Sequence, residues 1–281
     1  MTDVPRARLS DGSVATIEPD RFIPGTFQLV VDGTPQSHVH LDRPTELFFE
    51  YVQRIGHVID QIEPVGGPIT AIHLGAGALT LPRYIAATRP GSTQHVIELE
   101  PELVALVREY LPLPRGAAIR VRYGDAREVV GRLPAGLQGK ADLIISDIFR
   151  GSQTPAHVTA VGYFQELSAL LAPDGVVVVN VADGNRLEFA RRHAATLKEV
   201  FREVIILVEP GVLKGGRVGN LVFAARNQPL ASAQLARLAH LGPFPAKVVS
   251  GTELDQFIAG ARPIQDNDGT RPPTPPKELF G

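Results

Sequence analysis

The spacing of apolar residues changes near residue 64, from short alternating segments to a regular succession of strands and helices. Before that point, Phe27–Val31 alternates around apolar positions and ends at Asp32-Gly33, a pair typical of hairpin turns. The expected partner strand is Val39–Leu41. An amphipathic helix is predicted to open at Arg43, because apolar residues then recur at helical spacing, namely Leu47, Phe48, Tyr51, Ile55, Val58 and Ile59.

From residue 70 onward, short β-branched runs alternate with longer helical segments. The predicted strands are 70–74, 94–99, 119–123, 143–146, 176–181, 204–208 and 220–224, and the predicted helices are 81–87, 101–111, 126–133, 161–171, 186–201 and 231–241. Buried strands that alternate with helices are typical of a parallel sheet covered on both faces. The pattern therefore predicts an α/β fold with a doubly wound, mostly parallel sheet of seven strands and a small N-terminal β region.

Three regions follow from this pattern. Residues 1–63 form an N-terminal β-strand region with a linking helix, and residues 64–227 form the Rossmann-like domain, which begins at a segment rich in proline and glycine. Residues 228–281 hold a C-terminal helix and a proline-rich end, which we expect to be extended or disordered.

Composition narrows the classes of partner. The formal net charge is -2, so the chain has no overall positive field to attract nucleic acid or an anionic membrane. The chain has no cysteine, which excludes disulfides, thiolate metal sites and a cysteine nucleophile. No signal peptide is evident, and no apolar run approaches the roughly 18 residues of a membrane span. We expect a cytoplasmic protein that acts on a small-molecule acceptor and that can form a homodimer.

Residues suited to nucleotide binding follow four successive predicted strands, at the sheet edge where open parallel sheets bind ligands. The first strand is followed by the turn Gly75-Ala76-Gly77, where backbone without side chains lets a ligand approach. The second is followed by Glu98-Leu99, about twenty residues on, where an acid accepts hydrogen bonds from ribose hydroxyls. The third is followed by Gly124-Asp125-Ala126, where Asp125 can accept from an adenine amino group, and the fourth by Asp147.

Each of these motifs alone has a simpler structural explanation. The glycines could form only a turn, and each acid could only cap a helix N-terminus. A nicotinamide-binding fingerprint would need a third glycine where Thr80 stands, and it requires neither Asp125 nor Asp147. The four motifs together therefore favour a nucleoside site of another kind, and a nicotinamide-dependent oxidoreductase is a weaker alternative.

The order of these motifs resembles the spermidine synthases (polyamine aminopropyltransferases) over about residues 29–227. LVVDGTPQ (29–36) resembles the family's strand motif that ends in a ligand-contacting glutamine, here Gln36, and Tyr51 falls on the tyrosine of its Tyr-His-Glu-Met helix. Its later motifs are resembled by GAGALTLPR (75–83), IELE (97–100), YGDA (123–126), DIFRGSQTPA (147–156) and GVLKGGRVGN (211–220).

This resemblance implies a class I methyltransferase-type fold that binds S-adenosylmethionine, or its decarboxylated form, as a cosubstrate without a metal. It implies a nucleoside site formed by Gln36 and the strand-end residues, with Asp147 as the catalytic group. The reaction implied is alkyl transfer from sulfur to a small-molecule acceptor.

The chain departs from the family mainly where the acceptor binds. Ala78 and Arg150 stand in place of two acids, Val52 replaces a histidine, and the aromatic residues of the late segment are missing. Because a diamine needs carboxylates and aromatic faces, the putrescine site is expected to be eroded and putrescine to be a poor acceptor. Tyr51 and Arg150 are the predicted acceptor-binding residues.

The same departures bear on which group is transferred. An acid at position 78 would repel the carboxylate of S-adenosylmethionine, whereas Arg83 or Arg150 would attract it. The sequence thus favours methyl transfer slightly over aminopropyl transfer. A non-catalytic nucleoside-binding protein stays open, because loss of activity would leave the same divergence at the acceptor site.

Two further clusters are predicted to be structural. His38, His40 and Asp42 would share one strand face and could imitate a metal site, but a solvated strand face is the preferred interpretation. Asp266–Gly269 opens like a calcium loop but lacks the closing glutamate, so it is interpreted as a plain loop. It also resembles a Thr-Asp-Asp-x-x-Pro segment near the end of some divergent spermidine synthase-like proteins. No metal site is predicted.

Overall fold

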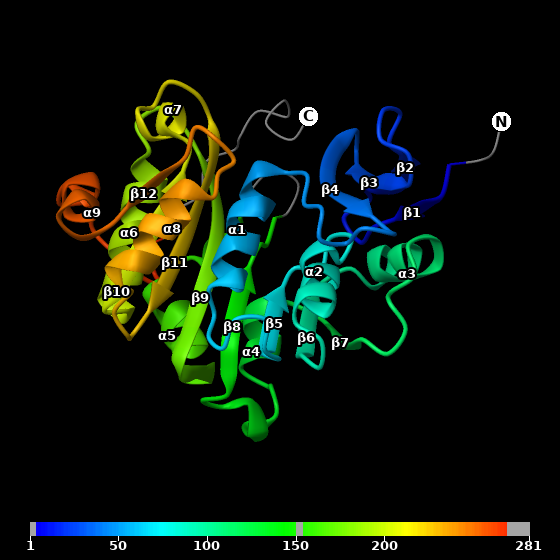
Figure 1. Cartoon of the computed structure of the whole chain (residues 1–281), viewed down its shortest axis with the longest axis horizontal. Coiled ribbons are helices and arrows are strands. Elements are labelled where there is room, and N and C mark those ends of the chain that lie inside the picture. The colour runs from blue at the N-terminus through cyan, green and yellow to red at the C-terminus, as the bar shows by residue number, and fades with distance from the viewer. Residues whose placement is uncertain (1–3, 150–153, 269–281) are drawn as a thin grey trace.

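The N-terminal residues form a small antiparallel sheet of their own. The computed structural model of the chain describes residues 4–149 and 154–268 (Figure 1). The strands of the small sheet follow chain order: β1 (Arg6–Arg8), β2 (Val14–Pro19), β3 (Thr26–Val31) and β4 (Thr34–His40). Asp32 and Gly33 both have positive φ, 47° and 79°, as in the tight turn that their sequence predicts. β4 is longer than the expected partner strand because pairing with β3 begins directly after this turn.

The larger sheet contains eight strands within the described ranges, in the order β12-β10-β11-β9-β8-β5-β6-β7. Their bounds are β5 (Thr70–Leu74), β6 (Thr93–Glu98), β7 (Ala118–Tyr123), β8 (Ala141–Ser146), β9 (Leu171–Asp183), β10 (Glu203–Val208), β11 (Gly219–Arg226) and β12 (Lys247–Val249). The five neighbours from β9 to β7 are parallel, and β11 is antiparallel to both β9 and β10. The mostly parallel α/β sheet is confirmed. The predicted number of seven strands is wrong, because three-residue β12 is too short to show a pattern.

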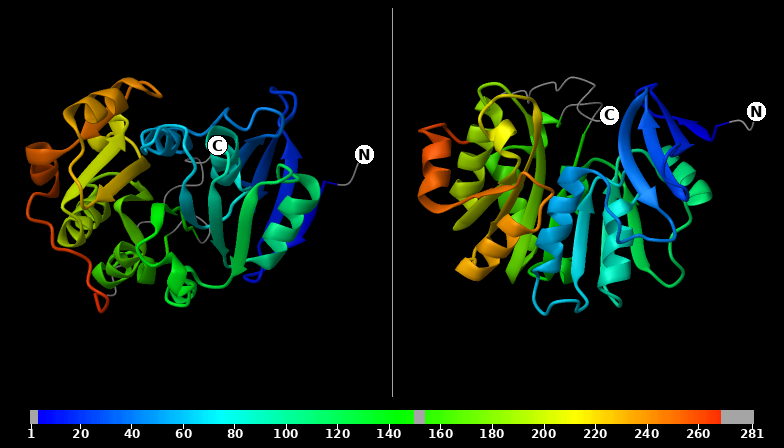
Figure 2. Two further views of the ribbon diagram at one scale, coloured as in Figure 1. Left: turned by 60° about the horizontal axis from the view of Figure 1, so that its bottom comes forward. Right: turned by 45° about the horizontal axis from the view of Figure 1, so that its top comes forward.

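Helices cover both faces of this sheet (Figure 2). Strand side chains alternate between two cores, so that Ile72 and Ile144 lie in one and Ala71 and Leu143 in the other. The second core is covered by α1 (Glu50–Asp60), α2 (Thr80–Thr88) and α8 (Ser232–His240). The first is covered by α4 (Ala126–Val130), α5 (Val161–Leu170), α6 (Glu188–Val200) and α9 (Gly251–Ile258).

The remaining helices join these layers to the small sheet and to the loops. α3 (Pro101–Tyr110) contacts β1 and β2 and shares a third core with the small sheet. The short segments are η1 (Ala135–Leu137), η2 (Ala156–Val158) and α7 (Pro210–Leu213). None of the helices formed by the described residues is long and apolar enough to cross a membrane.

The small sheet lies at the edge of the large sheet where a ligand is expected. The chain passes from β5 to β6 and β7 on one side and then returns to β8 on the other, which opens a crevice at the carboxyl ends of β5 and β8. The small sheet is tied to this edge by Ser10, whose backbone N–H donates to Glu100 Oε2 at 2.8 Å. α1 begins at Glu50 rather than Arg43, so residues 43–49 form a connection that carries two phenylalanines to the crevice.

Candidate active site

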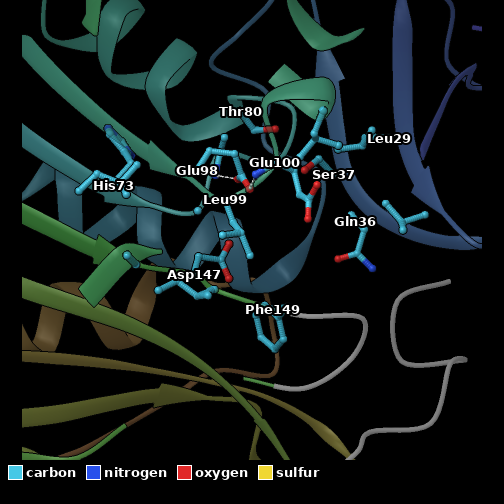
Figure 3. Close-up of a pocket in the computed structure, with 18 of the residues that line it drawn as sticks. Leu29, Gln36, Ser37, His73, Thr80, Glu98, Leu99, Glu100, Asp147 and Phe149 are labelled. Atoms are coloured by element: carbon cyan, nitrogen blue, oxygen red, sulfur yellow. Dashed lines mark hydrogen bonds between the residues drawn. The ribbon is translucent and has the colours of Figure 1, made fainter. Parts of the chain in front are cut away.

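A cavity of about 390 Å³ lies at this crevice, between the carboxyl ends of β5–β8 and the small sheet (Figure 3). Every nucleoside-site residue predicted from the sequence lines it: Gln36, Gly75, Ala76, Gly77, Glu98, Leu99, Gly124, Asp125 and Ala126. Tyr51 and Asp147 line it as well. The predicted acceptor residue Arg150 lies outside the described residues. Motifs separated by more than 100 residues in the sequence are therefore brought together around one volume.

The glycines after β5 allow close contacts within the protein itself. Gly75 has φ +97°, and a Cβ there would lie 2.4 Å from the backbone oxygen of Asp147. Gly77 has φ +48°, and a Cβ there would lie 2.5 Å from Ser37 Oγ, which also accepts the Ala78 N–H at 3.1 Å. The turn therefore brings the end of β5 against β8 on one side and against β4 on the other, leaving its backbone at the cavity surface.

The Glu98 carboxylate is held by this same turn. Its Oε2 accepts the backbone N–H of Ala76 at 2.8 Å, and its Oε1 accepts the backbone N–H of Glu100 at 3.0 Å. Burial raises the pKa of Glu98, while these backbone hydrogen bonds oppose the shift. The carboxylate is thus fixed at the end of β6 beside the glycine turn, where a ribose acceptor is expected.

Asp125 combines the two roles that the sequence left open. Its Oδ1 accepts the backbone N–H groups of Arg127 and Glu128 at 3.0 and 3.2 Å, so it caps the N-terminus of α4. Its Oδ2 lies 2.7 Å from Nε2 of His157, a half-exposed residue of η2 that also lines the cavity. One carboxylate oxygen therefore faces groups at the cavity rather than the helix.

Asp147 lies at the crevice between β5 and β8, and its side chain points into the cavity (Figure 3). Asn180 Nδ2 donates to its Oδ1 at 3.0 Å, and the Tyr51 hydroxyl also donates to the carboxylate. Burial raises the pKa of Asp147 to about 6, although both hydrogen bonds lower it. Burial and the neighbouring Asp147 charge raise the pKa of Tyr51 well above its usual value, so this phenol remains a donor.

Aromatic residues that the sequence did not assign to the site form one wall. His38 stacks on Phe48 with ring centroids 4.2 Å apart, Phe49 lies edge-on to Phe48, and all three line the cavity. His38 is only 4% exposed, and its Nε2 lies 3.1 Å from Asp20 Oδ2. The expected solvated face is therefore wrong, because Phe48 and Phe49, in the connection before α1, pack against this strand. The only sequence signal was the apolar pair Phe48-Phe49, which lies within the predicted helix but before the start of α1.

The charges around the cavity are predominantly negative. Among the described residues, its lining contains six carboxylates and no lysine or arginine; the acids are Asp11, Asp32, Glu98, Glu100, Asp125 and Asp147. Arg83 does not face it: this buried side chain donates to the backbone oxygens of Ala78, Leu111 and Pro112. The expectation that Arg83 attracts a ligand carboxylate is wrong. Within those same residues, no group of three or more His, Asp or Glu could hold a metal ion.

Comparisons with known proteins find polyamine aminopropyltransferases among those that are similar to this chain. No protein-family model matches the chain. A polyamine aminopropyltransferase of Vibrio vulnificus is 28% identical over 183 residues, which are 64% of this chain and 60% of that protein. One from Neisseria meningitidis is 26% identical over 154 residues, 54% of this chain and 56% of that protein. The matches thus span less than two thirds of these relatives.

The solved structures extend the similarity to nearly the whole chain. A probable spermidine synthase from Corynebacterium glutamicum is 29% identical with a TM-score of 0.86, over 96% of this chain and 99% of that one. This chain is similar to the spermidine synthases and has the methyltransferase fold. The spermidine synthase of Thermotoga maritima, with a TM-score of 0.55 and 13% identity over 91% of this chain and 82% of that one, shares the fold.

Of the departures at the acceptor half, the structure describes Val52, Ala78 and the late segment 211–220, whereas Arg150 lies outside the described residues. Val52 lines the cavity next to Tyr51, so an apolar surface stands there. Ala78 is fully buried in the core shared with the small sheet and does not line the cavity. An erosion of the putrescine site stays a prediction.

Proposed function

We propose that this chain is an S-adenosylmethionine-type alkyl transferase, which moves an aminopropyl or methyl group from a sulfonium nucleoside to a small-molecule acceptor. The observation that carries the proposal is the convergence of the four strand-end motifs, of which Asp147 is the last, on one cavity. The relatives named polyamine aminopropyltransferases support the same reaction class.

In this proposal the nucleoside lies along the ends of β5, β6 and β7. Glu98, fixed by the Ala76 and Glu100 amides, accepts hydrogen bonds from the ribose hydroxyls. Asp125 offers Oδ2 to the adenine amino group, and the Gly75–Gly77 turn presents its backbone to the chain that carries the sulfur. Leu99, Gly124 and Ala126 supply the contact surface of the base, and Gln36 closes the site from the small sheet.

Asp147 is the proposed catalytic residue. The lone pair of the attacking atom forms a bond to the carbon next to sulfur, the carbon–sulfur bond breaks, and its electron pair neutralises the sulfonium. A neutral amine becomes a cation as it attacks, so it must release a proton, which Asp147 accepts. A carboxylate with a pKa of about 6 is mostly ionised at neutral pH and is suited to this role. The protein otherwise contributes proximity and electrostatics.

The charge of the cavity favours decarboxylated S-adenosylmethionine and aminopropyl transfer. Decarboxylated S-adenosylmethionine ends in an ammonium, whereas S-adenosylmethionine also carries a carboxylate. The described lining offers six acids and no lysine or arginine, and Arg83 is engaged elsewhere. The same acids favour a cationic acceptor, whose body would pack on Phe48 and Phe49 with Tyr51 and Val52 beside the reacting nitrogen.

Binding and turnover test this proposal. Methylthioadenosine should raise the melting temperature, because a ligand bound only by the native state stabilises it, whereas NAD should not. Glu98→Ala and Asp125→Ala should each weaken binding by roughly 1–3 kcal/mol, as expected for hydrogen bonds to charged groups. Stabilisation by NAD alone would overturn the assignment in favour of an oxidoreductase.

The transferred group is then identified by mass spectrometry of a diverse amine panel incubated with each cosubstrate. A mass gain of one aminopropyl group from decarboxylated S-adenosylmethionine is the expected result, with putrescine among the slower acceptors. Methylated products would replace aminopropyl transfer by methyl transfer. Tight nucleoside binding without turnover of any amine would indicate a non-catalytic nucleoside-binding protein.

A further inference from the structure

Arg127 lies directly behind the cavity wall formed by Asp125, Ala126 and His157, here called the adenine-side wall. Its Nε and Nη2 donate to Glu166 Oε1 at 3.1 and 3.0 Å. Its Nη1 donates to the backbone oxygen of His157 at 3.0 Å and lies 2.6 Å from Asp266 Oδ1. One guanidinium therefore joins α4, α5, η2 and the C-terminal segment, a task that its rigid fork of donors allows.

The contacts of the wall form a closed ring. The His157 ring bonds Asp125 Oδ2, the His157 carbonyl accepts from Arg127, and Arg127 follows Asp125 by two residues. His157 is half-exposed and belongs to a helix of only three residues, so its own packing does little to fix it. The Asp125 carboxylate is anchored through Oδ1 at the start of α4, whereas the position of its partner at Oδ2, the His157 ring, depends on how firmly Arg127 holds the His157 carbonyl.

Asp266 is well placed to hold Arg127, because its segment is anchored across α5 and α6. The Ile264 carbonyl accepts the Val161 N–H at 2.9 Å, and the Ile264 N–H donates to Thr196 Oγ1 at 2.8 Å. Asp266 Oδ2 also accepts the Gly162 N–H at 3.1 Å. Asp268 pairs with Arg192 of α6, a residue that does not line the cavity.

Gly162 leaves space for the contact between Asp266 and Arg127. A Cβ at position 162 would lie 2.5 Å from Asp266 Oδ2 and 2.9 Å from Arg127 Nη2. Gly162 does not need a positive φ, and alanine is the better helix former, so the missing side chain serves the contact rather than the backbone.

We propose that Asp266, acting through Arg127, positions His157 and Asp125, so that the C-terminal segment sets the affinity and base selectivity of the nucleoside site. This inference rests on the proposed function. Asp266 and Arg127 are positioning residues: they lie behind the wall and would not touch the nucleoside. The C-terminal segment that carries Asp266 thus has a positioning role, although its sequence predicts only a plain loop.

The test compares two conservative changes in one segment. Asp266→Asn keeps an oxygen for the Gly162 N–H but removes the charge that holds Arg127. Asp268→Asn is the matched control, because it removes the charge that pairs with Arg192 instead. Isothermal titration calorimetry measures Kd for methylthioadenosine and for methylthioinosine, which has a 6-oxo group in place of the amino group. Asp266→Asn should raise the methylthioadenosine Kd by roughly 2- to 5-fold, the scale of a partly exposed ion pair, and reduce the preference for the amino base. Asp268→Asn should change neither.

Gly162→Ala provides an independent variant, because it displaces the same pair without changing any charge. It should reproduce the loss of base preference while keeping the melting temperature of the ligand-free protein. Arg127→Lys should also reduce the base preference, because a lysine cannot contact α5, η2 and the C-terminal segment at once. Unchanged base preference in Asp266→Asn and Gly162→Ala, or an equal effect of Asp268→Asn, would overturn the inference while leaving the proposed function intact. Failure of the wild type to bind methylthioadenosine would overturn both.

Discussion

At the scale of single residues, the Asp147 carboxylate combines burial with two donors. Asn180 and Tyr51 fix its orientation, and burial keeps its pKa near 6. Asp147→Asn should lower turnover by roughly 10²–10⁴-fold, as for loss of a general base, while the nucleoside affinity stays close to that of the wild type. Wild-type kcat/KM should rise as pH increases through about 6, because only the ionised carboxylate accepts a proton, and this rise should be absent from the variant.

A matched control for this prediction lies on the same strand. Asp142, at the opposite end of β8, accepts the backbone N–H of Thr70 at 2.8 Å and does not line the cavity. Asp142→Asn should keep both the turnover and the step near pH 6. If Asp147→Asn turned over like the wild type, Asp147 would have a structural role, and only the positioning of the reactants would remain to explain catalysis.

At the scale of elements, the turn between β5 and α2 depends on Gly75. Gly75→Ala should destabilise the protein by about 2–4 kcal/mol, because it combines a positive φ with a Cβ 2.4 Å from the Asp147 carbonyl oxygen. It should also reduce turnover, since the backbone that carries Asp147 must move. Urea unfolding and steady-state rates measure the two effects.

Gly116 is the control for backbone strain alone. It has φ +81°, and a Cβ there would meet nothing within 4 Å. Gly116→Ala should therefore cost only about 1–2 kcal/mol, the price of the left-handed conformation, and leave turnover unchanged. Equal losses of stability in the two variants would show that the contact with Asp147 is relieved without strain.

At the scale of the whole molecule, the partly buried Asp147 charge lowers the stability of the protein at neutral pH. Its pKa is about 6 in the folded protein and near 4 in the unfolded chain, so the folded state favours the protonated form. The resulting stabilisation is complete below about pH 4 and is lost as pH rises through 6. Asp147→Asn should therefore unfold at higher urea concentration than the wild type at pH 7.5, by on the order of 1–3 kcal/mol.

The same comparison at pH 4 should show little difference between the two proteins, and Asp142→Asn should show no such gain at pH 7.5. A variant less stable than the wild type at pH 7.5 would mean that the bonds to Tyr51 and Asn180 outweigh the cost of burying the charge.

Hydrophobic spacing alone determined most of the fold. The strand Thr70–Leu74 has the bounds that its apolar run predicts, and the other predicted strands of the large sheet are present with shifted ends. Parallel strands that are buried on both faces must be apolar throughout, so their pattern is local and strong. Four strand-end motifs located the candidate site for the same reason, since the order of strands and helices fixes where their carboxyl ends meet.

Contacts between distant segments were decided only by the tertiary structure. No local pattern shows that Phe48 stacks on His38, that Arg83 is engaged by backbone oxygens, or that Asp266 reaches Arg127 across 139 positions of sequence. Short β12 pairs with β10 only because the fold brings the two together. The sequence by itself determined the sheet and the edge at which the cavity lies, because both follow from local periodicity. The aromatic wall, the anchored acids and the C-terminal contact depend on packing between segments that local periodicity does not describe.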